Sequence, residues 1–417
     1  MIRKVMEVIH QSVGGLDVHK KMVMACRRRM IGDGQVESET REFGTTTLQL
    51  SALSKWLSEW GCTYVAMEST GVLWIPIWNV LEGNFKLLLT NAQHMKKVPG
   101  RKKDVTDAEW IAQLMQCGLL KGSFVPSREV RHWRMLTRQR MKLVDQRTGV
   151  VNRMHKVLQQ GNIKLSSVAT DVMGVSGRAM IQAMIEGESD AQTLAKMAKG
   201  RLKSKHEELV ESLEGRLNQD DRWVMKELWE QMEYLEDEIA RYDDQIKEKM
   251  SPYEESLERL MTIDLIERRS AENILAEIGP DMAVFPTDDN LVSWAGLCPG
   301  SEESAKKNRS GKMPKGNKWL RRALVEPAWG AARRKEGYLG AMYRGIAVRR
   351  GEKRAVIAVA RTILQAAWHV LSKGVEYKER GGDYFDRINS EQTKNKLIRR
   401  LERLGFEVEL KAKQAAV

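Results

Sequence analysis

The chain has 417 residues, of which 42% are hydrophobic and 30% charged, and its formal net charge is +13. That length favours two or three domains over a single core, and a soluble protein this basic usually binds a polyanion. Its four cysteines are widely spaced with no CxxC pair, which argues against a zinc ribbon or a secreted disulfide scaffold and suits the cytoplasm. The first fifteen residues lack the apolar run of a signal peptide.

Strand and helix patterns alternate over the first 90 residues. Residues 13–30 predict a β-hairpin, and apolar residues at helical spacing predict a helix over 47–60. A short apolar strand at 64–67, a helix at 74–81 and a strand at 85–89 follow. This order predicts an α/β domain with a mixed sheet.

From Thr106 the pattern is mainly helical, and the segment 128–156 is strongly basic. It holds nine Lys or Arg residues against Glu129 and Asp145. Apolar residues recur along it at helical intervals, so one face packs and the other is a basic stripe. A solvated surface helix would also fit, but a one-sided excess of cations favours phosphate contact. The predicted contacts are Arg131, Arg134, Arg138 and Lys142.

Residues 225–246 carry apolar side chains at alternating steps of three and four, which is a heptad seam. Three heptads can form either a coiled coil between chains or a hairpin within one chain. We predict that the seam mediates self-association.

A second globular part begins near Ser256. A helix pair is followed by a Lys-rich loop over 298–316, with Lys306, Lys307 and Lys315 as further predicted phosphate contacts. Two helices are expected near 317–336 and 353–373. The second contains Arg361, Gln365 and His369, which is typical of a packed helix and not of a membrane span.

Four carboxylates form the candidate site. Asp17 and Glu68 interrupt apolar strands, where a carboxylate is costly unless it is paired or bound to a metal. Asp104 and Asp107 are three residues apart at the start of a helix and so share a face. Each acid alone could be a helix cap or a solvated side chain, but a cluster of carboxylates needs a cation to offset the repulsion between them. Mg²⁺ is the natural choice, which indicates a nuclease-type site of the RNase H class.

At this point the sequence resembles a known family. The motifs GLDVHK, MESTG and KKDVTDAEW, in this order and spacing, resemble the bridge-RNA-guided DEDD transposases of bacterial insertion sequences, the insertion-sequence one-hundred-ten group. The resemblance implies a RuvC-like, RNase H-type N-terminal domain with Asp17, Glu68, Asp104 and Asp107 as catalytic metal ligands.

The C-terminal part resembles the helical transposase domain of the same family. That domain supplies a serine nucleophile shortly after a GLxP motif, here Gly296 to Pro299, and the matching serine is Ser304. The family commonly has two glycines after the serine, where this chain has Ala305 and Lys306. Ser301 and Ser310 lie nearby, so they remain alternatives for the nucleophile.

These features predict four regions. They are a RuvC-like α/β catalytic domain over 1–160, a helical coiled-coil segment over 161–255, a mainly α-helical domain with the serine over 256–375, and a tail over 376–417. The expected function is an RNA-guided, Mg²⁺-dependent DNA transposase or recombinase with a serine-linked intermediate. Expected partners are donor and target DNA, a structured guide RNA and further copies as a dimer or tetramer, with no membrane. The alternatives are a Mg²⁺-dependent junction resolvase, which uses water and not a serine, and a non-catalytic RNA-binding scaffold.

Overall fold

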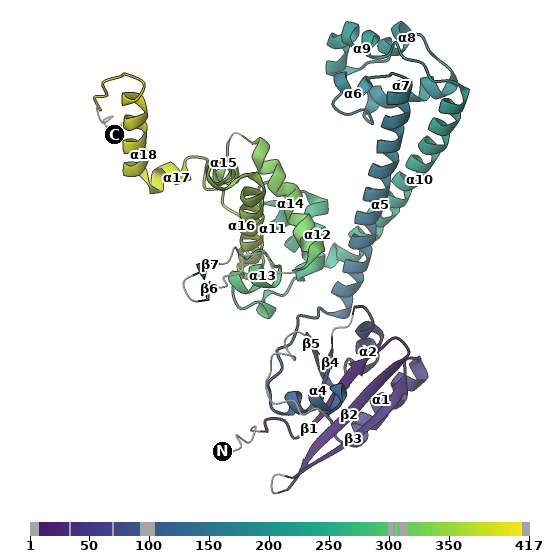
Figure 1. Cartoon of the computed structure of the whole chain (residues 1–417), viewed down its shortest axis with the longest axis vertical. Helices are drawn as coiled ribbons and strands as arrows, with labels where there is room; N and C mark the ends of the chain where they lie inside the picture. Colours follow the sequence, from purple (N-terminus) through teal and green to yellow (C-terminus); the bar gives the residue numbers. More distant parts are fainter. Residues whose placement is uncertain are drawn as a thin grey trace. The chain divides into compact units, whose positions relative to one another are not determined.

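A computed structural model gives the arrangement of the chain (Figure 1). It describes residues 8–32, 35–68, 71–91, 105–298, 303–304, 307–308, 316–334 and 336–410. The chain divides into two compact units, Met1–Arg128 and Glu129–Val417, which are described separately.

The first unit is built on a five-stranded mixed sheet in the order β3-β2-β1-β4-β5. β1, β2 and β3 form an antiparallel meander, while β4 and β5 run parallel to β1. This strand order confirms the predicted RNase H-like α/β fold class. The elements are β1 Ser12–Val18, β2 Met22–Ile31, β3 Gln35–Gly44, α1 Thr47–Glu59, β4 Tyr64–Glu68, α2 Trp74–Leu81, β5 Lys86–Thr90 and α4 Asp107–Gln116.

Both faces of this sheet are covered. Because side chains alternate along a strand, Leu16 and Met67 point to one face, where they pack with α1 and α2. Val13 and Ala66 point to the other face and pack against α4. Strands that are buried on both faces read as nearly continuous apolar runs, which is why the sequence predicted β1 and β4. β3 was not predicted, because polar residues dominate it.

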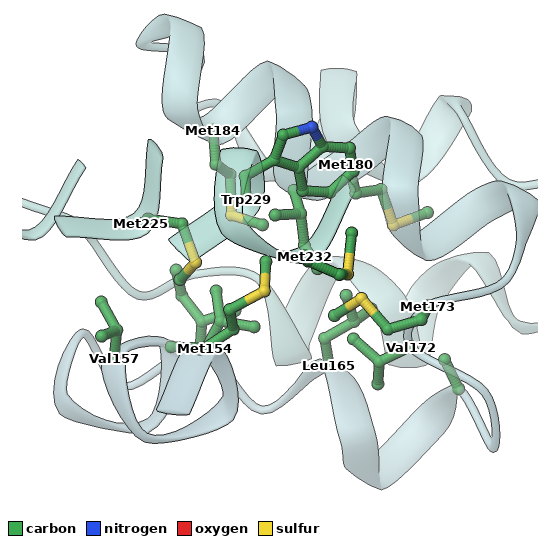
Figure 2. Close-up of a cluster of buried hydrophobic side chains, with 14 of the residues drawn as sticks. Met154, Val157, Leu165, Val172, Met173, Met180, Met184, Met225, Trp229 and Met232 are labelled. Atoms are coloured by element: carbon green, nitrogen blue, oxygen red, sulfur yellow. The ribbon is translucent and has the colours of Figure 1, made fainter. Parts of the chain in front are cut away.

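The second unit begins with an arm of two long helices, α5 Arg128–Gln160 and α10 Gln219–Met250. The pairs Arg147–Glu236 and Arg153–Gln231 show that the two helices are antiparallel. Between them the chain forms a cap of short helices, namely α6 Leu165–Val168, α7 Val175–Glu186, α8 Ala191–Lys196, η1 Gly200–Lys205 and α9 His206–Ser212. Figure 2 shows the methionine-rich core that joins the cap to the arm.

The heptad seam lies inside this core. Met225, Met232 and Leu235 are buried in the same cluster as Val150 and Met154 of α5. The alternative of a hairpin within one chain is therefore confirmed, and the prediction that the seam mediates self-association is wrong. The seam packs against α5, so this helix forms part of the arm.

The rest of the second unit is a helical bundle with a tail. The bundle contains η2 Ser251–Tyr253, α11 Glu254–Met261, α12 Arg268–Ile278, η3 Met282–Val284, α13 Asp288–Trp294, α14 Lys318–Arg333, α15 Tyr338–Arg350 and α16 Glu352–Lys373, and the tail contains α17 Tyr384–Ile388 and α18 Ser390–Glu402. Among the described residues, α16 alone is long and apolar enough to cross a membrane. It packs here against α11, α13, α14 and α15, and its apolar side, including Val359 and Ile363, is buried. Its composition thus fits the central helix of a bundle.

We predict that Met232→Ala lowers the free energy of unfolding by about 2–5 kcal/mol, because the fully buried side chain would leave a cavity in the arm. Tyr234→Ala is the control on the exposed side of the same helix and should change stability by less than about 0.5 kcal/mol. Denaturant unfolding followed by circular dichroism measures both. An internal seam is contradicted if Met232→Ala instead lowers the mass of the particle in solution and leaves the stability unchanged.

Candidate functional site: an acidic sheet edge and a serine-bearing loop

Asp17 and Glu68 lie at the same edge of the sheet. β1 and β4 are neighbouring parallel strands, and their last paired residues are Leu16 and Met67. Asp17 and Glu68 come next on each strand, and by alternation both point to the face that α4 covers. The Asp17 carboxylate is only 17% exposed, and its Oδ2 lies 3.0 Å from Nε2 of His19.

Asp107 reaches this edge because α4 runs antiparallel to β1. The amides of Ile9 and His10, just before β1, donate to the carbonyl of Gln116 at the end of α4, at 2.9 and 3.1 Å. The start of α4, with Asp107 in its first turn, therefore lies towards the end of β1 that carries Asp17. A capping box fixes this start, because Thr106 and Glu109 bond each other's backbone N–H groups.

Gly15 allows α4 to lie directly on the sheet. A Cβ atom at this position would be 2.3 Å from the Ala112 nitrogen and 2.4 Å from the Ala108 oxygen. Only glycine avoids that overlap with helix backbone. The close approach fixes α4, with Asp107 in its first turn, on the face of the sheet to which Asp17 and Glu68 point.

Asp104, the fourth predicted acid, lies outside the described residues. Among the residues that are described, no group of three or more His, Cys, Asp or Glu side chains is arranged to hold a metal ion. The donor type nevertheless fits Mg²⁺, which prefers carboxylate oxygens. Thr90, paired with Glu68 across β4 and β5, adds a fully buried hydroxyl with no hydrogen-bond partner in the described part of the chain. The assignment of the four acids as metal ligands stays a prediction.

The serine predicted as nucleophile lies on a loop whose two ends are in close backbone contact. A Cβ on Gly316 would lie 2.0 Å from the Ala295 oxygen, and one on Gly296 would lie 2.7 Å from the Gly316 Cα. Gly296 also has φ +70°, a conformation that favours glycine. Within the loop, the backbone of β6 Glu303–Ser304 pairs antiparallel with β7 Lys307–Asn308. Ser304 is thus part of a hairpin, while Ser301 and Ser310 lie outside the described residues.

A buried carboxylate, Glu277, binds Asn317 at the end of this loop, and the sequence did not predict this role. Glu277 is 2% exposed, and it accepts two hydrogen bonds from Arg138, at 2.7 and 2.8 Å. Its Oε2 also accepts from Nδ2 of Asn317, at 2.6 Å, and Asn317 caps the helix that follows the loop. Glu277 ends an apolar helix pattern, so nothing in the sequence marked its partners.

The predicted phosphate contacts on α5 fall into two groups. Arg134 and Arg138 both bind Glu277 or its carbonyl, and burial lowers the pKa of the Arg134 guanidinium to about 10, so it stays charged at neutral pH. Lys142 is exposed and Arg131 is half-buried. Lys307 is described only by its backbone in β7, and Lys306 and Lys315 lie outside the described residues. The nucleic-acid role of all seven stays a prediction.

The cysteines do not offer a competing nucleophile in the first unit. Burial raises the pKa of the Cys26 thiol to about 11 and also raises the pKa of Cys62. A thiol in this state is a poor nucleophile, because the thiolate is the reactive form.

Two family models match the chain. One, for DEDD transposases of the IS110 type and described as "Transposase", matches residues 14–163, and the other, "Transposase IS116/IS110/IS902 family", matches residues 257–344. Together these segments span more than half of the chain. The chain belongs to the IS110 family of transposases. It is therefore a phosphoryl-transfer enzyme with a DEDD N-terminal domain.

Two further proteins are similar to this transposase. A protein described as "Probable family 20 transposase" from Pseudomonas aeruginosa is 25% identical over 319 residues, covering 75% of this chain and 85% of the relative. The solved structure of T. thermophilus RuvC in complex with a Holliday junction substrate is 12% identical and covers 27% of this chain and all of that one, with a TM-score of 0.21.

We predict that Gly15→Ala lowers strand cleavage by about 100-fold or more, because a shift of α4 by about 1 Å would displace Asp107. Gly14→Ala is the matched control, since its Cβ would meet only side-chain atoms of Leu57 and Val65, which can move. Cleavage is measured per folded protein, with folding followed by thermal unfolding. Equal activity of the two variants would show that the position of α4 does not matter to the chemistry.

Proposed function

We propose that this transposase cuts and rejoins DNA through a covalent serine intermediate, using the four acids Asp17, Glu68, Asp104 and Asp107 to hold Mg²⁺. Bound Mg²⁺ would neutralise negative charge on the scissile phosphate. The observation that carries the proposal is the pairing of two features in one chain, an acidic sheet edge and a serine on a hairpin whose loop is closed at its base.

In the proposed reaction the Ser304 oxygen attacks the phosphorus, and the bond from phosphorus to the 3′ oxygen breaks. The serine proton is transferred to the departing oxygen, directly or through water, which leaves a 3′-hydroxyl and a 5′-phosphoserine. After strand exchange, a 3′-hydroxyl attacks a partner phosphoserine and restores the serine. The covalent link conserves the phosphodiester bond energy, so no ATP site is needed.

The proposed partners follow from the reaction and from the family resemblance. Donor and target DNA must both be held, which calls for a dimer or tetramer. A structured guide RNA would select the two DNAs by base pairing, and the net charge of +13 suits a protein with two polyanionic partners. We place the protein in the cytoplasm, where its free cysteines would stay reduced.

A metal-dependent junction resolvase is the second candidate. It would use the same acids, since RNase H-type sites hydrolyse DNA with water. It needs neither Ser304 nor the closed loop. Detection of a covalent protein–DNA adduct would therefore favour the transposase proposal over the resolvase.

We predict that changing Asp17, Glu68, Asp104 or Asp107 to Ala lowers recombination by about 10³-fold, because several kcal/mol of charge stabilisation would be lost. In the absence of metal each variant should be at least as thermally stable as wild type, since one repelling carboxylate is gone. Mg²⁺ should raise the melting temperature of wild type more than that of the variants. Glu59→Ala, an exposed acid on α1, is the control and should behave as wild type. Variants that respond to Mg²⁺ as wild type does would exclude these acids as ligands.

We predict that Ser304→Ala prevents formation of the covalent protein–DNA species while the protein still folds and binds nucleic acid, since only a hydroxyl is lost. Denaturing gels with labelled DNA detect the adduct. Ser301→Ala and Ser310→Ala test the register of the nucleophile. If Ser304→Ala still forms the adduct, the control that loses it identifies the nucleophile. If all three variants cleave DNA and no adduct ever forms, the resolvase proposal replaces this one.

A further inference from the structure

Exposed positive charge is concentrated at the turn between α15 and α16. Arg349 and Arg350 end α15, Lys353 and Arg354 begin α16, and the two helices share Gly351 at the turn. All four cations are exposed, and none forms an ion pair with a described residue. Glu352 is the acid within the turn. We call these four cations the basic turn.

Three arginines of the arm differ from those of the basic turn. Arg138 is bound to Glu277, Arg140 to Glu272 and Arg147 to Glu236. A cation that is bound to a carboxylate has little attraction left for a phosphate, and all three are also partly or fully buried. Strong attraction for a polyanion is therefore expected at the basic turn more than on α5.

Helix stability accounts for only two of the four cations in the basic turn. Cations at the C-terminus of α15 are favoured by the helix dipole, so Arg349 and Arg350 have a structural reason to be there. Lys353 and Arg354 lie in the first turn of α16, where the same dipole disfavours a cation. A bound anion beside the start of α16 would offset this unfavourable interaction and so account for their position.

An open groove continues from the basic turn. Its volume is about 700 Å³, and it lies between α15 and the segment α17–α18. Arg344 and Arg349 line it from α15 and Lys396 lines it from α18, with Asn389 and Gln392 between them. The groove also contains one acid, Asp386, whose Oδ1 accepts from the Thr393 hydroxyl at 3.3 Å. Amides and guanidinium groups of this kind bind phosphate oxygens.

We propose that the basic turn and its groove bind the backbone of duplex DNA. α15 and α16 pack with α14, which starts where the serine-bearing loop ends, so this surface belongs to the bundle that carries the loop. A duplex whose scissile phosphate is held at this loop would lie against the same bundle. This placement rests on the proposed function, in which the serine-bearing loop acts on DNA, whereas the binding test below does not require Ser304 to be the nucleophile.

The test is the salt dependence of DNA binding. The variant changes Arg349, Arg350, Lys353 and Arg354 to Gln, and the matched control changes Lys226, Arg241, Lys247 and Lys249 of the acidic helix α10 to Gln, for the same loss of charge. Both are made in the Ser304→Ala chain and assayed in EDTA with a random-sequence DNA duplex, so that no cleavage intervenes. We expect the slope of log Kobs against log salt to fall by about 3 to 4 in the variant, because each phosphate contact contributes about 0.9. The control should keep the wild-type slope.

A double variant protects the test against misfolding. Lys353→Gln with Arg354→Gln should lower the slope by about 2. It should also raise the melting temperature, since both cations oppose the helix dipole. Unchanged slopes in both variants, or an equal fall in the control, would overturn the proposal. If an RNA hairpin loses salt dependence in the variants and duplex DNA does not, the surface binds RNA and the proposal is wrong.

Discussion

The buried carboxylate of Glu277 is the interaction on which the second unit most depends. It joins three parts of the chain, because α5 supplies Arg138, α12 supplies Glu277 itself and the base of the serine-bearing loop supplies Asn317. A neighbouring buried pair, Arg140 with Glu272, ties the same two helices together. Removing one partner of such a pair leaves an uncompensated charge, which typically costs about 3–5 kcal/mol. The loop therefore starts from a rigid base, although its residues are mainly polar and lysine-rich.

The first unit depends on a different constraint, the contact of helix backbone with strand backbone at Gly15. The sheet alone would bring Asp17 and Glu68 together, because they end neighbouring parallel strands. The position of Asp107 depends instead on α4, which lies against β1 without an intervening side chain at Gly15. The two units thus use opposite means to position the groups that are predicted to react. One relies on the absence of a side chain and the other on a fully satisfied charged network.

Much of this could be predicted from the sequence, and the failures have physical causes. The strands that are buried on both faces were apparent as apolar runs, and α14 and α16 appeared near their expected positions because one side of each is continuously apolar. α15 was missed, since only Leu339, Gly340 and Tyr343 of it are buried and no helical period stands out. The cap between α5 and α10 was unreadable because its short helices share one methionine-rich core. The basic stripe on α5 was visible, but Glu277, which binds both Arg134 and Arg138, lies about 140 positions away in the sequence, and no local pattern reveals such a contact.

The internal use of the heptad seam has a consequence for assembly. With Met225, Met232 and Leu235 buried within one chain, an assembly of several copies must use surfaces other than this seam. A chain of net charge +13 also repels its own copies, and bound nucleic acid would remove much of that repulsion. On this reasoning, self-association of the free protein is weakest at low salt, where repulsion is least screened. Under the proposed function, assembly would then be coupled to nucleic-acid binding, because bound DNA or RNA would reduce the repulsion between copies.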